Sequence, residues 1–142
     1  MEFLKFSVKA IFTTVLFRLL IGLSKYSGQG QSPMYGDYEA QRHWQEITYN
    51  LPALDWYVDG PKNDLGYWGL DYPPLSAYHS YVVSLFAKEE WVKLFFSRGT
   101  EGDDHKLFMR SSVIISDLLI YIPAVLVFSY KFASHPKANA IM

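Results

Sequence analysis

Residues Met34 to Trp44, with the sequence MYGDYEAQRHW, hold the densest group of chemically useful side chains in the chain. Two carboxylates, one guanidinium, one imidazole and three aromatic rings lie within these eleven residues. An acidic side chain is almost never fully buried in a packed core unless it is paired. The composition therefore predicts a hydrated, shaped site and not part of a packed core.

The spacing of the same residues also fits a polar helix on the protein surface. Asp37 stands where an N-cap residue is expected, directly before a run of good helix formers. In this alternative Arg42 and His43 pair with acids three or four residues away, at about 0.2–0.5 kcal/mol per pair. The available acids are Glu39 and Glu46.

A second cluster of similar composition lies at Tyr67 to Tyr72, with the sequence YWGLDY. It places Asp71 between aromatic rings and directly before the rigid dipeptide Pro73-Pro74. The alternative is an aromatic-rich loop that precedes the next hydrophobic helix, because Tyr and Trp collect at membrane interfaces for amphipathic reasons alone.

Composition excludes several classes of protein and site. The chain has 142 residues, half of them hydrophobic, and a net charge of −1, which is not basic enough to predict nucleic-acid binding. It has no cysteine, so disulfides and thiolate metal sites are excluded. The apolar residues are gathered in blocks, which indicates contact with lipid. We therefore expect an all-α integral membrane protein.

Residues 1–24 are predicted to form the first transmembrane helix. The apolar block from Leu4 to Leu23 is as long as a helix that crosses about 30 Å of hydrocarbon. Lys9 can reach the headgroups, whereas Arg18 lies deeper and needs protein, water or an anion beside it. The alternative is a cleavable signal peptide, with a basic start and an apolar middle.

Residues 25–74 have no hydrophobic run and are predicted to form one long, functional loop. Three basic and seven acidic residues give it a net charge of −4. A helix is expected up to about Tyr49, because Pro52 ends it. Structureless loops of this length are uncommon in compact proteins, and the aromatic content argues against disorder.

Residues 75–96 are predicted to form a second transmembrane or interfacial helix. The apolar block from Leu75 to Ala87 has only thirteen residues, so it crosses a bilayer only if it continues into the segment WVKLFF. Residues 97–110 then form a polar loop, residues 111–132 the third and clearest transmembrane helix, and residues 133–142 a truncated tail. Asp117 and Pro123 interrupt the third helix and suit a position beside neighbouring helices.

The distribution of Lys and Arg predicts the orientation. Basic residues are frequent at the amino terminus and between Lys88 and Arg110, where they include Lys93, and sparse between residues 25 and 74. If the middle block crosses, loop 97–110 is cytosolic and loop 25–74 is luminal.

Three stretches resemble a known family. They are GDYEAQRHWQEIT at 36–48, YWGLDYPPLSAYHS at 67–80, and HKLFMR at 105–110 followed by DLLIYIPAV at 117–125. They look like the amino-terminal part of the endoplasmic-reticulum glucosyltransferases that use dolichyl-phosphate glucose, and are most similar to the α-1,3-glucosyltransferases that add the first glucose to the lipid-linked oligomannose precursor of N-glycans. The resemblance implies a GT-C-like fold in the endoplasmic-reticulum membrane, dolichol-linked donor and acceptor lipids as partners, no nucleic acid, no metal and no cofactor beyond the donor.

The resemblance also implies roles for individual residues. It makes Asp37 the general base of an inverting transfer, beside a first wall of binding residues and opposite a second one. The first wall comprises Glu39, Arg42, His43 and Trp44, and the second Trp68, Asp71 and Tyr72. A metal site from Asp37, His43 and Asp71 is conceivable, but its spacing matches no recognised ligand pattern. The chain also has no phosphate-binding glycine loop and no nucleotide-sugar DXD motif.

The resemblance covers only part of a family member. The chain is therefore expected to be a fragment or a short isoform, and glucosyl transfer by this chain alone stays open. Arg18 and Asp117 lie within the predicted spans as ionisable groups that normally need neighbours, which predicts poor stability of this chain in detergent. The alternative function is that of a non-catalytic membrane adaptor whose aromatic loop binds a glycan or a protein.

Overall fold

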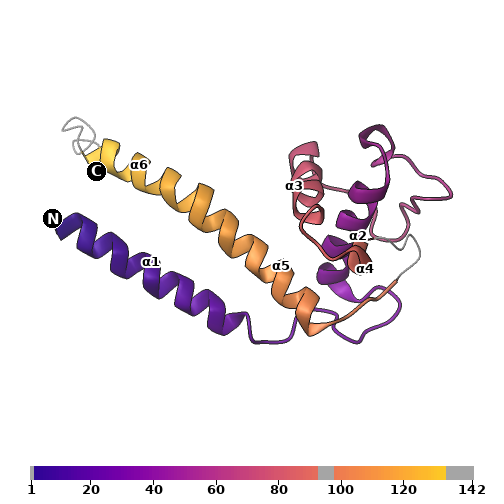
Figure 1. Cartoon of the computed structure of the whole chain (residues 1–142), viewed down its shortest axis with the longest axis horizontal. Coiled ribbons are helices and arrows are strands. Elements are labelled where there is room, and N and C mark those ends of the chain that lie inside the picture. The colour runs from indigo at the N-terminus through magenta and orange to yellow at the C-terminus, as the bar shows by residue number, and fades with distance from the viewer. Residues whose placement is uncertain (1, 93–97, 134–142) are drawn as a thin grey trace. The chain divides into compact units, whose positions relative to one another are not determined.

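The computed structural model describes residues 2–92 and 98–133, and every regular element in these ranges is helical. Figure 1 shows them in order. They are α1 (Glu2–Ile21), α2 (Gly36–Asn50), the 3-10 turn η1 (Ala53–Asp55), α3 (Pro74–Ser84), α4 (Glu89–Val92), α5 (Asp103–Ser116), the π-helical turn η2 (Asp117–Tyr121) and α6 (Ile122–Ala133). The predicted all-α class is confirmed for the described residues.

The chain divides into two units. We call Lys25–Met109 the compact unit, and Met1–Ser24 with Arg110–Met142 the helical-pair unit. The predicted ends of the second and third hydrophobic segments fall partly outside the described residues, as do Lys93 and almost all of the tail 133–142.

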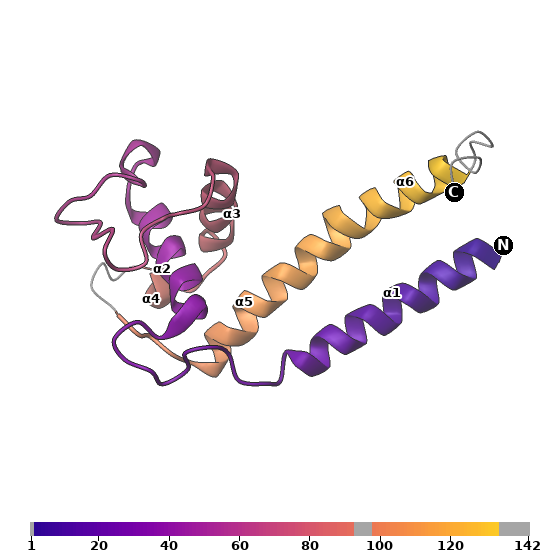
Figure 2. The ribbon, with the colours of Figure 1, turned by 180° about the vertical axis from the view of Figure 1, so that it is seen from behind.

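α5, η2 and α6 belong to a continuous helix from Asp103 to Phe132, of which the part from Arg110 onward belongs to the helical-pair unit (Figure 2). Its length and hydropathy suffice to cross a membrane, and it is the single helix of that kind among the described residues. The 20 residues of α1 cover the predicted first span, and their crossing stays a prediction.

Two ionisable residues of the helical-pair unit pair with each other. The guanidinium of Arg18 on α1 forms an ion pair with the carboxylate of Asp117 in η2. Arg110 also donates to the carbonyl oxygens of Gly22 and Ser24, at the end of α1, the second at 3.0 Å. Arg18 and Asp117 are expected to need neighbours, and each has the other as its partner in this unit.

The π-helical turn has a local cause in the sequence. Pro123 lacks an N–H group, and in an α-helix its ring would clash with the carbonyl group of Leu119. In η2 the N–H of Ile122 instead donates to the carbonyl oxygen of Asp117, five residues earlier. The wider turn accommodates the proline without ending the helix.

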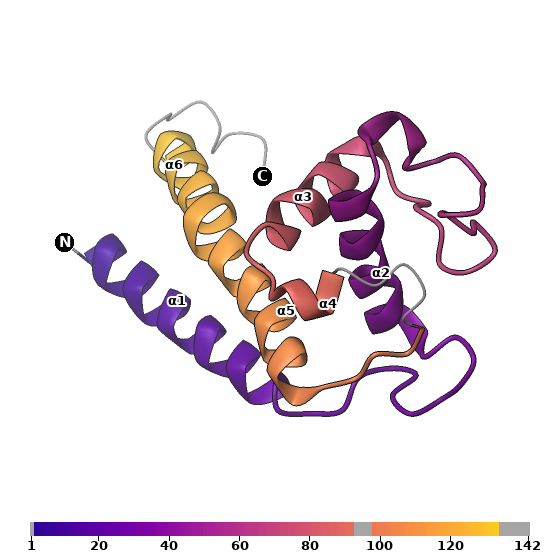
Figure 3. The same ribbon diagram turned by 45° about the vertical axis from the view of Figure 1, so that its right-hand side comes forward.

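In the compact unit, α2 packs against α3 (Figure 3). The hydrophobic core between and beside them contains Ala40, Trp44, Ile47, Trp56, Leu70 and Ala77. The polar, net-acidic stretch of the sequence therefore has a core of its own, built largely from Trp and small residues.

The start of α2 differs from the prediction. The N-cap residue is Tyr35, with φ 57°, and Asp37 lies inside the first turn. Gly36 follows with φ 72°, and a Cβ atom there would lie 2.2 Å from the carbonyl oxygen of Ser27. A side chain at residue 36 is therefore excluded sterically, and this close approach, not an N-cap side chain, fixes where the helix begins. The carboxyl end, at Asn50, is one residue beyond the predicted end.

The segment predicted as a second long helix contains two short ones in its described part. α3 has 11 residues and ends at Ser84, and α4 begins at Glu89. The side chain of Asn50 on α2 donates to the carbonyl oxygen of Val92, so α4 lies against α2.

Candidate active site

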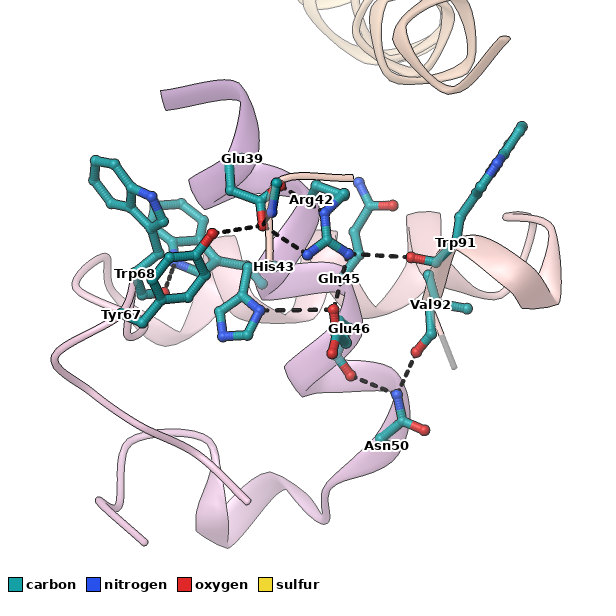
Figure 4. Close-up of polar contacts among 12 residues, drawn as sticks. Glu39, Arg42, His43, Gln45, Glu46, Asn50, Tyr67, Trp68, Trp91 and Val92 are labelled. Carbon is teal, nitrogen blue, oxygen red and sulfur yellow. Dashed lines mark hydrogen bonds and ion pairs between the residues drawn. The ribbon is translucent and has the colours of Figure 1, made fainter. Parts of the chain in front are cut away.

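A buried network of charges occupies one face of α2 (Figure 4). The guanidinium of Arg42 donates from Nε and Nη2 to the two carboxylate oxygens of Glu39, both at 2.7 Å. Its Nη1 donates to Glu46 Oε2 at 2.8 Å. These three side chains are at most 1% exposed. The pairing of Arg42 with Glu39 and Glu46 that the surface-helix alternative predicted is confirmed, but the predicted surface position is wrong, because the helix buries these charged pairs.

Electrostatics keep Arg42 charged. Burial opposes the charge of Arg42, but the hydrogen bonds and negative charges of Glu39 and Glu46 outweigh it and raise the pKa of Arg42. Because both ends of its fork are occupied by carboxylates, Arg42 is not available to hold a substrate phosphate.

Glu39 links α2 to two distant parts of the compact unit. Its Oε1 accepts a hydrogen bond from the hydroxyl of Tyr67 at 2.9 Å and one from the backbone N–H of Gly99 at 3.0 Å. Burial and the charge of Glu39 raise the pKa of Tyr67, which therefore remains a donor. The Glu39–Arg42 pair thus positions the second aromatic cluster against the first.

His43 and Trp44 contribute to packing. The ring of His43 meets the ring of Tyr67 edge-on, with centroids 5.2 Å apart. Trp44 is only 3% exposed, and its indole N–H donates to the carbonyl oxygens of Trp68 at 2.9 Å and Gly69 at 3.2 Å. Trp44 is therefore part of the core, and its ring is not an open platform.

The second predicted wall is only partly exposed. The backbone of Trp68 has φ 47°, and its indole N–H donates to the carbonyl oxygen of Met34 at 2.6 Å. Asp71 is exposed, and Tyr72 is 54% exposed, with its ring edge-on to that of Trp44 at 5.2 Å.

Asp37 lies on the other side of α2 from the charge network. Residues five apart on an α-helix are separated by about 140° around its axis, so Asp37 and Arg42 belong to different faces. Asp37 is exposed and shares its face with Gln41 and Trp44, four and seven residues later. Asp37 and Arg42 are therefore not neighbours in space on α2, although they are close in the sequence.

A groove of about 380 Å³ opens on this same face, between α2 and α3. It is lined by Gln41, Trp44, Tyr72, Leu75, Ser76, His79 and Ser80. Of the predicted site residues, Trp44 and Tyr72 line this groove, and Asp37 lies one helical turn before Gln41.

Three contacts join segments of the compact unit that are distant in the sequence, and local sequence did not predict them. Tyr38 Oη lies 2.5 Å from His105 Nδ1, Tyr26 donates to Glu101 at 2.6 Å, and Arg98 donates to Asp64 at 2.6 Å. Burial, followed by the charge of Arg42, lowers the pKa of His105 to about 4, so this ring is neutral at physiological pH. The partners are 34 to 75 residues apart, so no local pattern could have paired them.

These contacts bear on the predicted topology. Residues 98–109 share one unit with residues 25–74, and Gly99, Glu101 and His105 form hydrogen bonds with that stretch. Two segments bonded in this way lie on the same side of a membrane, so these bonds favour the interfacial alternative for the segment between them over the transmembrane one. The side of the membrane that each stretch faces stays a prediction.

The structure gives no support for a metal site. Among the described residues, no group of three or more His, Cys, Asp or Glu side chains is placed to hold a metal ion, and Asp37, His43 and Asp71 are not so grouped.

Comparison with known proteins places these observations in a family context. The family model described as "ALG6, ALG8 glycosyltransferase family" matches residues 13–142. The chain is similar to the dolichyl pyrophosphate Man9GlcNAc2 alpha-1,3-glucosyltransferase of Gallus gallus, with 58% identity over 114 residues, which are 78% of this chain and 22% of the relative. It is similar to the protein of the same name from Saccharomyces cerevisiae, with 54% identity over 120 residues, which are 81% of this chain and 21% of the relative. A probable enzyme of this name from Caenorhabditis elegans is 49% identical over 139 residues, which are 96% of this chain and 27% of the relative. The chain thus spans about a fifth to a quarter of the length of these curated relatives.

Proposed function

The chain belongs to the ALG6, ALG8 glycosyltransferase family, and from this premise we propose that it forms the amino-terminal part of a dolichyl-pyrophosphate Man9GlcNAc2 α-1,3-glucosyltransferase. In the proposed reaction, a mannose hydroxyl of the lipid-linked oligosaccharide attacks the anomeric carbon of dolichyl-phosphate glucose. The bond from this carbon to the phosphate oxygen breaks, dolichyl phosphate leaves, and the anomeric configuration inverts. The fold we propose is GT-C-like.

One observation carries the assignment of the base. Of the three acids in α2, Glu39 and Glu46 are buried and held by Arg42, whereas Asp37 is exposed beside the groove. Asp37 also lies in the first turn, where the helix dipole favours negative charge. It is therefore the α2 carboxylate that a substrate hydroxyl can reach, and we assign it the role of proton acceptor.

The remaining predicted site residues receive revised roles. Glu39 and Arg42 act as positioning residues, because they fix α2 to Tyr67 and Gly99. Trp44 forms the floor of the groove, and Tyr72 its exposed aromatic wall. Because Arg42 is occupied, the groups that hold the donor phosphate come from elsewhere in the active protein.

We further propose that the protein lies in the endoplasmic-reticulum membrane with the compact unit in the lumen. The part of the Asp103–Phe132 helix from Arg110 onward and α1 are then the two crossings, which follow and precede this unit in the sequence. Lys5 and Lys9 at the amino terminus are on the cytosolic side, in agreement with the positive-inside rule.

The proposal is tested by grafting this chain onto the remainder of the Saccharomyces cerevisiae relative. The chimera is expressed in cells that lack their own first-glucose enzyme, and lipid-linked oligosaccharides are profiled. We expect the glucosylated precursor with the chimera and the unglucosylated precursor with its Asp37→Asn variant. Accumulation of the unglucosylated precursor by a chimera that is expressed and membrane-integrated, while the intact relative restores transfer, contradicts the proposal and favours a non-catalytic adaptor.

A further inference from the structure

The groove between α2 and α3 combines an aromatic wall with uncharged polar groups. Tyr72, at the edge of the groove, is 54% exposed, and Gln41 and His79 also line the groove and are exposed. Ser76 and Ser80 add two hydroxyl groups, and the buried Trp44 forms the floor. Its volume of about 380 Å³ lies within the usual range for small-molecule sites, about 300–1,000 Å³.

The lining of the groove selects for one class of ligand. None of the residues that line it is Asp, Glu, Lys or Arg, although charged residues make up 19% of the chain. A phosphate or a charged peptide would find no Lys, Arg, Asp or Glu side chain there. Amide, imidazole and hydroxyl groups can each exchange hydrogen bonds with an alcohol, and an exposed tyrosine ring packs against apolar C–H groups. A hexopyranose offers both hydroxyl groups and apolar C–H groups, and it carries no charge.

We propose that this groove is a binding subsite for one neutral hexopyranose residue. Gln41 and His79 hydrogen-bond to its hydroxyl groups, and Tyr72 packs against its ring. The identity of the sugar rests on the proposed function, which makes it the mannose that receives glucose. Asp37 precedes Gln41 by one turn on the same face of α2, so a sugar in the groove presents a hydroxyl group toward the proposed base.

The experiment uses the full chain in lipid nanodiscs, without sugar detergents. Methyl α-D-mannopyranoside and the free Man9GlcNAc2 glycan are titrated, and binding is followed by saturation-transfer NMR. Loss of one neutral hydrogen bond weakens binding by about 2- to 10-fold. We therefore expect this decrease for Gln41→Ala and for His79→Ala, a larger one for the double variant, and partial recovery in His79→Gln.

Gln31→Ala is the matched control, since Gln31 is an exposed glutamine outside the groove. It should bind both sugars like the unsubstituted chain. Equal tryptophan-fluorescence unfolding midpoints for all variants verify that the fold is kept. Absence of binding, or binding that the groove variants do not weaken, overturns the proposal. Competition of inorganic phosphate with either sugar for binding also overturns it, because the groove would then not be selective for a neutral ligand.

The sugar-subsite proposal and the proposed function can be refuted separately. If the chimera still transfers glucose with the same acceptor KM after Gln41→Ala and His79→Ala, the sugar-subsite proposal is refuted and the proposed function stands. If the chain binds the mannoside through Gln41 and His79 but the chimera transfers no glucose, the sugar-subsite proposal stands and the proposed function is refuted.

Discussion

Arg42→Met is the substitution that most directly tests the buried charge network. It removes the partner of two carboxylates, Glu39 and Glu46, whose side chains are each 1% exposed. Removing one member of a buried, hydrogen-bonded ion pair typically costs about 3–5 kcal/mol, because the other charge remains buried without compensation. With a typical urea m-value of about 2 kcal/mol/M, the unfolding midpoint of the compact unit should fall by about 1.5–2.5 M.

The chain is well suited to this measurement. All four tryptophans lie between Lys25 and Met109, so their fluorescence reports on the unfolding of the compact unit. Lys106→Met is the matched control, because Lys106 pairs with Asp103, which is 91% exposed. Because the carboxylate of this pair is in water, the pair contributes about 0–1 kcal/mol, so this midpoint should move little. Equal, small shifts for the two variants would refute the burial and pairing that we assign to Arg42.

Three further predictions address topology, the paired helices and pH. Glycosylation acceptors introduced near Lys62 and near Gly102 should both be modified in microsomes. Modification near Lys62 alone would instead indicate that the chain crosses the membrane between these two sites. Arg18→Leu should lower the thermal midpoint of helix loss measured by circular dichroism, and Arg18→Leu with Asp117→Leu should recover most of it; an additive double variant would contradict the pairing. Because the pKa of His105 is lowered from 6.5 to about 4, the folded state resists protonation, and stability should fall as pH decreases from about 6.5 toward 4. His105→Gln should reduce this slope in urea titrations at each pH, and an unchanged slope would assign it to other groups.

The sequence predicted the features that depend on short-range chemistry. The apolar run after Val113 fixed a membrane-compatible helix, and Pro52 fixed the end of α2 close to its observed position. Helical spacing also identified Glu39 and Glu46 as partners for Arg42. These are contacts within one element, where the spacing of residues and their separation in space are related by the helix itself.

Features that depend on distant contacts were not predictable in this way. Glu39 bonds to Gly99, 60 residues later, and this contact places loop 98–109 beside the first motif. Charge counting instead assigned that loop to the other side of the membrane. Likewise, a dense cluster in the sequence suggested one site, but the helix distributes Asp37 and Arg42 over different faces. Burial of the charged face and exposure of Asp37 became apparent only with the packing of α2 against α3 and α4.

The central claim is that Asp37 is the proton acceptor in glucosyl transfer. It is tested by comparing Asp37→Asn and Asp71→Asn in the purified chimera, with turnover and acceptor affinity measured separately. Asn keeps the size of the side chain and its hydrogen-bonding reach but cannot accept the proton, so Asp37→Asn should lower turnover about 100- to 10,000-fold with acceptor binding largely kept. Asp71→Asn should cost less. Retention of more than about a tenth of the turnover by Asp37→Asn, together with loss of activity in Asp71→Asn, would contradict the assignment and give the role of base to Asp71.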